Sequence, residues 1–462
     1  MREKHVYQGN WHLPNFEEIV GGTLTFEPDE GAYLELFGGF SCWDPFDLPS
    51  GIEIVLGTVV SGKAITLLDC FCTSRRNSGY GITSIEYLKF SVRFVLIDAH
   101  IESLETLKFS KILANIHNLR EWVGVSGVNV TYSDLSDGRE VEASYRQPVN
   151  VEFEIDQSTR GKLVFDRHTS ERHRVAFTFS LEQTIKLEIT STESVPLEQL
   201  LKKVTVFQNF LTLALYHPTF IVDVTLESDS VVRSYEGFGD IPTSIILLAS
   251  QQYKVDFFGP KKNDYEVFFT YDNIAQRFPE MIRVWYQKYE QLDHIMYLLF
   301  QQFYLRLHFT ENSFLNLAQA IESYHERSRP LTKMPKSDYK KMRTDLLATS
   351  APQYHEWLQG MFNFGNSPTL HQRLEDIISQ FVGTDLDWIA LDREIFIQQI
   401  KWSRNYYTHL GKELESKALK TYDLYKASLK LKLILSVCFL MEMGIGIETI
   451  AGWLTGKTNR FL

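Results

Sequence analysis

Residues 266–300, EVFFTYDNIAQRFPEMIRVWYQKYEQLDHIMYLLF, contain the point at which the hydrophobic pattern of the chain changes. Before this stretch, apolar and polar residues often alternate, which is typical of β-strands. After Pro279, apolar residues recur at the 3.6-residue spacing of an α-helix. The chain is therefore predicted to divide into a β-rich part at 1–275 and an all-helical part at 280–462, an α+β architecture.

The composition describes a folded protein with ample core. The chain has 462 residues, of which 44% are hydrophobic and 23% charged, and this excludes a disordered, collagen-like or coiled-coil chain. The net charge of −11 argues against a protein that coats nucleic acid through bulk charge, but it permits a local basic site. Four cysteines are too few for a disulfide scaffold in a chain of this size.

Neither the start of the chain nor its longest apolar run indicates a membrane. The N-terminal sequence MREKHVYQGNWHLPNF lacks the apolar core of a signal peptide. The apolar run from Leu433 to Met441 stops at Glu442 and is too short to span a bilayer. We therefore expect no membrane contact and a location in the reducing cytoplasm.

Short segments rich in β-branched and aromatic residues follow one another through the first part of the chain, punctuated by Gly, Asp, Asn and Ser. Many short strands at this spacing predict an antiparallel sandwich or barrel. Two helices are expected among them, at 109–123 and at 196–216, the second with a broad apolar stripe. The expected strands are 23–28, 32–38, 52–57, 87–97, 128–133, 151–155, 162–166, 174–181, 184–190, 220–228 and 266–272.

The second part of the chain is expected to be a helical bundle. A basic, proline-containing segment at 326–345 is typical of an exposed connection. The expected helices are 280–308, 312–328, 336–348, 368–382, 388–410 and 412–443.

Three motifs favour structural explanations over functional ones. Gly57 to Ala64 nearly fits a phosphate-binding loop, but Ala64 lacks the required hydroxyl and a strand-like sequence follows, so a hairpin turn is favoured. Cys70 and Cys72, with Cys42, supply only three thiols for a zinc site, so buried core thiols are favoured and no metal is expected. The Arg- and His-rich run at 166–175 lies between two predicted strands and is typical of a solvated hairpin.

The segment Arg404-Asn405-Tyr406-Tyr407-Thr408-His409 is the strongest candidate for chemistry. It closes the helix predicted at 388–410, with Gly411 as the expected stop signal. Histidine titrates near neutral pH and can exchange a proton with a ribose 2′-hydroxyl or a leaving oxygen. Arginine binds a phosphate and stabilises added negative charge, so the pair suits a ribonuclease that uses no metal or other cofactor.

Helical geometry limits how these side chains can meet. Asn405 and His409 are four residues apart and lie on one helix face. Arg404 and His409 are five residues apart, or about 140° around an ideal helix. The two converge only if the last turn loosens or if a second subunit completes the site. Arg93 with His100 and Arg167 with His173 show similar spacing, but in strand-like segments.

With these residues in view, the chain resembles the ApeA-type branch of the HEPN superfamily (higher eukaryotes and prokaryotes nucleotide-binding). Ribonuclease members of that superfamily carry Arg, four to six residues and His, often with Asn after the Arg. The helix FLNLAQAIESYHER at 314–327 is similar to the first core helix of that branch, and the β-rich part is similar to its N-terminal domain. The resemblance covers nearly the whole chain.

The resemblance implies roles for particular residues. Arg404 and His409 match the catalytic pair, and Asn405 matches its polar companion. Glu322 corresponds to an acidic residue that some members place on the opposing helix to orient the Arg, although a partly exposed helix charge explains it equally well. Tyr407 supports the site by stacking on bases or by lining a dimer seam.

The resemblance also implies a function. It points to a metal-independent endoribonuclease of bacterial anti-phage defence, a homodimer through the helical domain, that cleaves host RNA, with tRNA as one substrate class, when a trigger such as a phage protein activates it. DNA is not an expected partner. Two alternatives stay open: a non-catalytic HEPN module that binds nucleotide or RNA or acts as a scaffold, and a ligand-binding β protein with a helical dimerisation tail.

Overall fold

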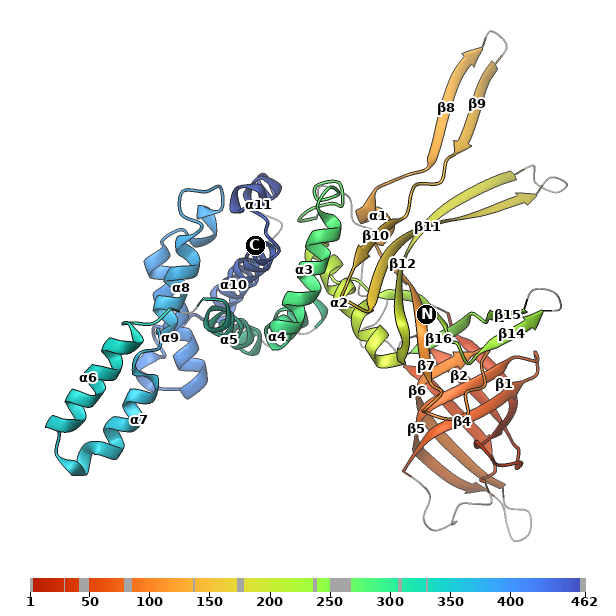
Figure 1. Cartoon of the computed structure of the whole chain (residues 1–462), viewed down its shortest axis with the longest axis horizontal. Helices are drawn as coiled ribbons and strands as arrows, with labels where there is room; N and C mark the ends of the chain where they lie inside the picture. The colour runs from red at the N-terminus through yellow and green to blue at the C-terminus, as the bar shows by residue number, and fades with distance from the viewer. Residues whose placement is uncertain are drawn as a thin grey trace. The chain divides into compact units, whose positions relative to one another are not determined.

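The computed structural model describes residues 3–28, 30–40, 50–78, 85–135, 138–172, 178–235, 239–249, 267–305, 310–329 and 331–457. The chain forms two compact units, Met1–Tyr286 and Gln287–Leu462 (Figure 1). The first unit is β-rich and the second is helical, as the change of hydrophobic period predicts. Among the described helices, none combines the length and the apolar character needed to cross a bilayer.

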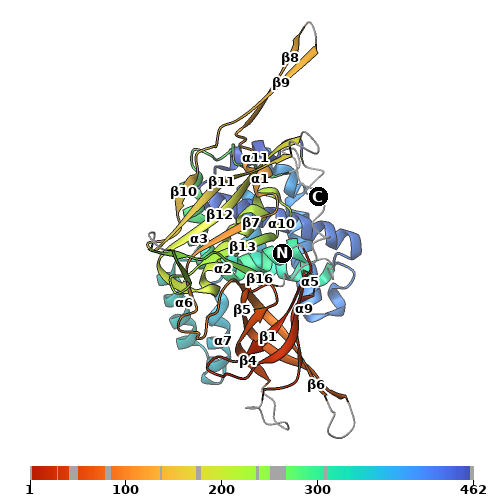
Figure 2. The same ribbon diagram turned by 90° about the vertical axis from the view of Figure 1, so that its right-hand side faces the viewer.

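Six antiparallel strands of the N-terminal unit close into a barrel, which decides between the two expected β architectures. Their order is β6-β3-β2-β1-β4-β5, and β5 pairs again with β6 to complete the ring (Figures 1 and 2). Closure leaves no free edge within the barrel. The strands are β1 His5–His12, β2 Val20–Glu27, β3 Gly31–Phe37, β4 Gly51–Val59, β5 Ala64–Ser78 and β6 Ile85–Ile97.

Large apolar side chains fill the core of the barrel. Trp11 on β1 is fully buried, and so are Leu24 on β2 and Leu34 on β3. Gly57 stands opposite Trp11 in the β1–β4 register, and a Cβ at this position would lie 2.3 Å from the indole ring. The absence of a side chain at Gly57 therefore makes room for the tryptophan.

An open sheet extends from the barrel through β6. The order continues β16-β13-β7-β12-β11-β10, so β10 is the outer edge of a twelve-stranded sheet. Helix α2 packs against β7 and β12, and a cluster of aromatic rings around Phe210 and Trp122 fills the space beneath it. The elements are β7 Lys108–Ile116, β10 Val151–Glu154, β11 Thr159–Arg172, β12 Thr178–Pro196, α2 Leu197–Leu215, β13 Ile221–Glu227 and β16 Ile245–Ala249.

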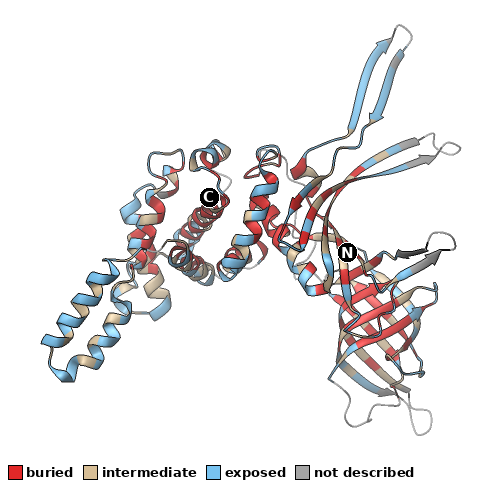
Figure 3. Cartoon of the chain, viewed as in Figure 1, coloured by how far each residue is buried: buried red, intermediate tan, exposed pale blue. Residues whose placement is uncertain are grey.

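Two further hairpins belong to this unit. β8 (Val128–Leu135) pairs with β9 (Gly138–Tyr145), and β14 (Val232–Tyr235) pairs with β15 (Gly239–Pro242). The β8–β9 hairpin projects from the sheet, and each of its side chains that the structure describes is exposed or partly exposed (Figure 3). These described side chains therefore form no core of their own.

Two predictions for this part of the chain are wrong. The expected helix at 109–123 is strand β7 followed by the single-turn helix α1 (Leu119–Val123), because β7 pairs between β12 and β13 in the centre of the sheet. The expected strand at 266–272 is turn and irregular structure over its described residues, 267–272. There the aromatic residues Phe268 and Phe269 are buried in a loop rather than in a strand.

The helical unit is built around α5. It packs against α10, α4, α9 and α8, and it buries Phe314, Leu317, Ile321 and Tyr324. Helices α6 and α7 form a hairpin in which no residue is fully buried (Figure 3). Helix α3, Phe278–Gln291, starts in the N-terminal unit, which includes its residues up to Tyr286. The helices that follow it are α4 Asp293–Tyr304, α5 Thr310–Ser328, α6 Lys336–Thr349, α7 His355–Gly365, α8 Leu370–Ser379, α9 Arg393–His409, α10 Thr421–Glu442 and α11 Ile447–Leu454.

The order of the expected helices is confirmed, and several bounds are corrected. The single helix expected at 280–308 is two helices, α3 and α4, with a break at Leu292. The helix expected at 412–443 begins only at Thr421, after a short 3-10 turn at Lys412–Leu414. Helices α7 and α11 were not expected, and the 326–345 segment contributes most of α6 to the exposed hairpin.

Candidate functional site

Helix α9 presents the candidate residues along its last two turns. The helix buries Phe396, Ile397, Ile400 and Ser403 against the rest of the unit. The residues from Arg404 to Tyr407, which follow Ser403, are each half-buried. The side chain of Arg404 retains 33% exposure, so it is both anchored and accessible.

Glu322 of α5 holds Arg404 in place. The Arg404 Nη2 atom lies 3.1 Å from Glu322 Oε2, and its Nη1 donates to Asn405 Oδ1 at 3.4 Å. A guanidinium carries five N–H groups in a fixed plane, so two such contacts orient it and leave donors for a ligand. The structure therefore brings Arg404, Asn405 and Glu322 together.

Arg373 supports the Arg404–Glu322 pair and is not among the site residues predicted from the sequence. Its Nη1 donates to the backbone oxygen of Glu322 at 3.2 Å, and its Nε donates to Pro368 O at 3.2 Å. Its Nη2 also bonds the Glu326 carboxylate. Arg373 thus fixes the turn of α5 that carries Glu322, and nothing in the spacing of residues along the chain signals this contact.

His409 lies at the very end of α9 and is exposed. Within the described residues it makes no hydrogen bond or ion pair, and no contact joins it to Arg404. The helix ends because Leu410 adopts the left-handed conformation, with φ 52°. The expected stop at Gly411 is thus wrong by one residue. Arg404 and His409 are about 140° apart on an ideal helix, so their side chains do not meet within one chain.

Tyr407 anchors the chain that follows α9. Its hydroxyl donates to Leu419 O at 2.9 Å, while Ser403 Oγ accepts from Leu419 N–H at 2.9 Å. Burial raises the pKa of Tyr407, so its hydroxyl stays protonated at neutral pH. Tyr406 packs beside it, with Lys420 Nζ 4.1 Å above its ring. These contacts give Tyr407 a structural role at the end of the helix.

A buried histidine lies one turn further along α5. His325 has no side-chain exposure, and its Nε2 lies 3.2 Å from Asp376 Oδ2, which also pairs with Arg329 at 2.8 Å. Burial lowers the pKa of His325, although the Asp376 carboxylate acts in the opposite direction. This histidine is therefore neutral at neutral pH and belongs to the scaffold behind the site.

Glu322 also lines a shallow hollow of about 350 Å³. Helices α4, α5 and α8 line it, through residues that include His294, Gln319 and Arg373. Neither Arg404 nor His409 lines this hollow. The candidate site is thus a surface at the end of α9 rather than an enclosed pocket.

The remaining motifs lie in structural positions. Gly57 to Ala64 spans the β4–β5 hairpin, so the hairpin prediction is confirmed. Cys70 is buried and Cys72 is half-buried on β5, while Cys42 is outside the described residues. No cluster of His, Cys, Asp and Glu within the described ranges is placed to hold a metal ion.

The two alternative Arg and His pairs also lie apart from any site. Arg93 pairs with Asp69 at 3.0 Å, and His100 Nε2 donates to Gly57 O at 2.7 Å. Arg167 is exposed on the β11–β12 hairpin, as expected, whereas His173 lies outside the described residues.

Comparison with protein families agrees with this architecture. The family model described as ApeA N-terminal domain 1 matches residues 6–285, and the one described as Apea-like HEPN matches residues 315–448. The chain belongs to the ApeA-type HEPN proteins. HEPN domains are generally ribonucleases, which supports a nuclease role for this ApeA-type protein, and the family points to anti-phage defence. Searches of curated proteins and of solved structures returned no significant match.

Proposed function

We propose that this ApeA-type protein is a metal-independent endoribonuclease whose active residues are Arg404, Asn405 and His409. The observation that carries the proposal is the Arg404–Glu322 contact of 3.1 Å at the end of a helix that also presents an exposed histidine. A guanidinium oriented by one carboxylate and still one-third exposed suits the binding of an RNA phosphate.

The proposed reaction is an attack by the ribose 2′-hydroxyl on the adjacent phosphate. His409 removes the hydroxyl proton as general base, and the 5′-oxygen of the next nucleotide leaves after protonation by a general acid. Arg404 binds the phosphate and stabilises the charge that develops on its oxygens, while Asn405 positions the arginine. The products are a 2′,3′-cyclic phosphate and a 5′-hydroxyl.

We further propose that the active form is a homodimer through the helical domain. The divergence of Arg404 and His409 on one helix is relieved if each site combines side chains from two copies. Residues 392–462 carry eleven Lys and Arg against seven Asp and Glu, whereas the whole chain has a net charge of −11. The positive balance of this C-terminal stretch favours binding of an RNA backbone there rather than to the rest of the acidic chain.

The biological role proposed for this chemistry is growth arrest in the cytoplasm of an infected bacterium. The nuclease would cleave host RNA, with tRNA as one substrate class, when a phage-derived trigger such as a phage protein acts on the N-terminal unit. A ribonuclease that harms its host must be restrained until infection, and the β-rich unit is the part of the chain available for that control.

The test uses phage challenge together with sequencing of RNA 5′-hydroxyl ends in cells that carry wild type, Arg404→Ala or His409→Ala. New ends are expected only with wild type, and they should also form with purified protein in EDTA. Arg393→Ala, at the exposed start of α9, is the matched control for the arginine, and His294→Ala serves for the histidine. Protection that persists in the folded Arg404 and His409 variants, without new ends, would refute the proposal.

One observation favours the alternative of a non-catalytic binding module. Arg404 and His409 make no contact with each other within one chain, so a single chain does not assemble the pair that cleavage needs. In that alternative the purified protein binds RNA or nucleotide without cleaving it, and Arg404→Ala weakens binding. A binding assay run beside the cleavage assay separates the two functions.

A further inference from the structure

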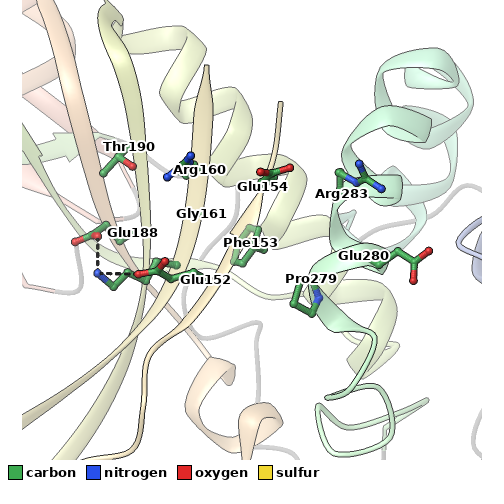
Figure 4. A pocket seen from close by; sticks show the side chains of 11 residues that line it. Glu152, Phe153, Glu154, Arg160, Gly161, Glu188, Thr190, Pro279, Glu280 and Arg283 are labelled. Carbon is green, nitrogen blue, oxygen red and sulfur yellow. Dashed lines mark ion pairs between the residues drawn. The ribbon is translucent and has the colours of Figure 1, made fainter. Parts of the chain in front are cut away.

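Strand β10 forms one edge of the large sheet, and a cleft of about 650 Å³ lies beside it (Figure 4). Side chains of β10, β11 and β12 line one wall of this cleft, and the first turns of α3 line the other. All of these residues belong to the N-terminal unit. No described strand pairs with the outer side of β10.

The register of β10 determines which backbone groups face the cleft. The N–H of Ile155 donates to Thr159 O at 3.1 Å, which makes these two residues a hydrogen-bonded pair at the end of the hairpin. Hydrogen-bonded and non-hydrogen-bonded residue pairs alternate along an antiparallel ladder. The backbone of Phe153 therefore bonds the backbone of β11, whereas the backbone groups of Glu152 and Glu154 do not. The N–H and C=O groups of Glu152 and Glu154 therefore point away from β11, as at any exposed strand edge.

A ladder of alternating charges crosses the sheet and ends at the same edge. Lys111 Nζ on β7 lies 3.0 Å from Glu227 Oε1 on β13 and 3.2 Å from Glu188 Oε2 on β12. Lys162 Nζ on β11 continues the ladder, at 3.7 Å from Glu188 and 3.8 Å from Glu152 on β10 (Figure 4). The sign of the side-chain charge thus alternates across five strands, and the last charge, on β10, is the Glu152 carboxylate.

The end of the ladder is open to a further cation. The side chain of Glu152 is 76% exposed, compared with 17% for Glu188 in the middle of the ladder. Glu154 stands opposite Arg160 in the same register and is exposed as well. Across the cleft, α3 contributes one exposed carboxylate, Glu280, and one exposed guanidinium, Arg283, so the two charges of that wall balance. An added strand that brought cations opposite Glu152 and Glu154 would continue the alternation.

The edge is already built for such an addition. Phe153 packs against Phe207 of α2 and Phe278 of α3, which fixes β10 from below. Lys203 of α2 bonds the Asp156 carboxylate in the turn after β10. A strand held in its final conformation binds a partner with less loss of conformational entropy than a mobile one.

We propose that the β10 edge binds an extended segment of a partner protein as an additional strand. The segment carries Lys or Arg at two alternate positions, opposite Glu152 and Glu154, with an apolar residue between them on the side of Phe153. This assignment extends the regulatory role proposed for the N-terminal unit. Its test needs no RNA cleavage, so either proposal can fail without the other.

The first test measures binding of the full-length protein to the peptide TKVKVT-amide, labelled with fluorescein at its N-terminus, by anisotropy. The peptide is expected to bind, and its charge-reversed counterpart TEVEVT is expected to bind much less. Glu152→Gln and Glu154→Gln should each weaken binding by about two- to fivefold, the range of a cross-strand charge pair. Glu193→Gln, an exposed glutamate elsewhere on β12, should leave binding unchanged.

The second test separates strand addition from simple charge attraction. Glu152→Pro and Glu152→Ala both remove the carboxylate, but only proline also removes the N–H that faces the cleft. Proline is tolerated at an edge position whose N–H faces outward, and thermal melts verify that both variants fold. The proline variant should bind the peptide about two- to tenfold more weakly than the alanine variant. Equal binding by these two variants, equal binding of both peptides, or no binding of TKVKVT would overturn the proposal.

Discussion

At the scale of single residues, Glu322 stands out because it orients Arg404 without using all of its donors. The carboxylate contacts Nη2, and Asn405 accepts from Nη1. Arg373 donates to the backbone oxygen of Glu322. The direction of the Arg404 guanidinium is therefore set by helix packing and not only by its own rotamer.

We expect Glu322→Gln to lower the rate of RNA cleavage by about ten- to a hundredfold, because it replaces a charge-assisted hydrogen bond to Arg404 with a weaker one. Single-turnover kinetics should place the loss in the cleavage step, with RNA affinity changed little. Glu375→Gln, an exposed position on α8, is the control. A cleavage rate equal to wild type would show that Glu322 is an ordinary helix charge.

His325 makes the stability of the helical unit depend on pH. Burial lowers its pKa in the folded chain, where Asp376, Arg329 and Arg373 surround it. The unfolded chain therefore takes up a proton at higher pH than the folded chain does. As a consequence, the free energy of unfolding decreases as the pH falls below the ordinary histidine pKa of 6.5.

This dependence is measurable by urea unfolding at about pH 5 and about pH 7.5. His325→Gln, which cannot titrate, should show a smaller difference in unfolding midpoint between the two pH values than wild type does. His294→Gln, at a position with 81% side-chain exposure, should retain the full difference. A His325 variant with the same pH dependence as wild type would contradict this assignment.

At the scale of elements, the barrel depends on a close approach between β1 and β4. Gly57→Ala would place a methyl group 2.3 Å from the buried Trp11 ring, so the ring or the strand must shift. Overpacking of this kind costs about 1–3 kcal/mol, and we expect a lower melting temperature for the N-terminal unit. Gly21→Ala on β2, where a Cβ meets nothing within 4 Å, is the control. Similar melting temperatures for the two variants would count against this packing.

The elements that the sequence predicted are those whose hydrophobic period is unambiguous. Segments such as 184–190 alternate strictly, and helix 196–216 has a continuous apolar stripe, so both are confirmed. Residues 109–116 fit a helix by period, yet they form the central strand β7, because pairing with β12 and β13 decides their conformation. Such pairing joins residues more than 70 positions apart, and no local pattern records it.

The candidate site, like the fold, was predicted only where a local pattern or the family resemblance identifies the residues. The Arg404 to His409 segment and its helix were identified from sequence, and Glu322 was found through the family resemblance. Arg373 and His325 were missed because their contacts depend on how α5 and α8 pack, which spacing along the chain does not specify. The resemblance also left open whether Arg404 and His409 converge, and a single copy of the chain leaves them without a mutual contact.

At the scale of the whole molecule, that lack of contact is an argument for a shared site. Arg404 points to Glu322 of its own chain, whereas His409 is exposed at the helix end and free to face another copy. In a symmetric dimer, the same surface is used by both subunits, so each Arg404 would meet the partner's histidine and two equivalent sites would form. A site divided in this way is active only when two chains associate.

Mixing two inactive variants tests the division directly. In a dimer of one Arg404→Ala chain and one His409→Ala chain, one composite site keeps both an arginine and a histidine, while the other site loses both. Half of the dimers in an equal mixture are of this kind, so activity should recover to about a quarter of wild type. Each variant alone should be inactive. If equal mixing of folded, dimeric variants restores nothing, both residues act within one chain, and the last turn of α9 must loosen to bring them together.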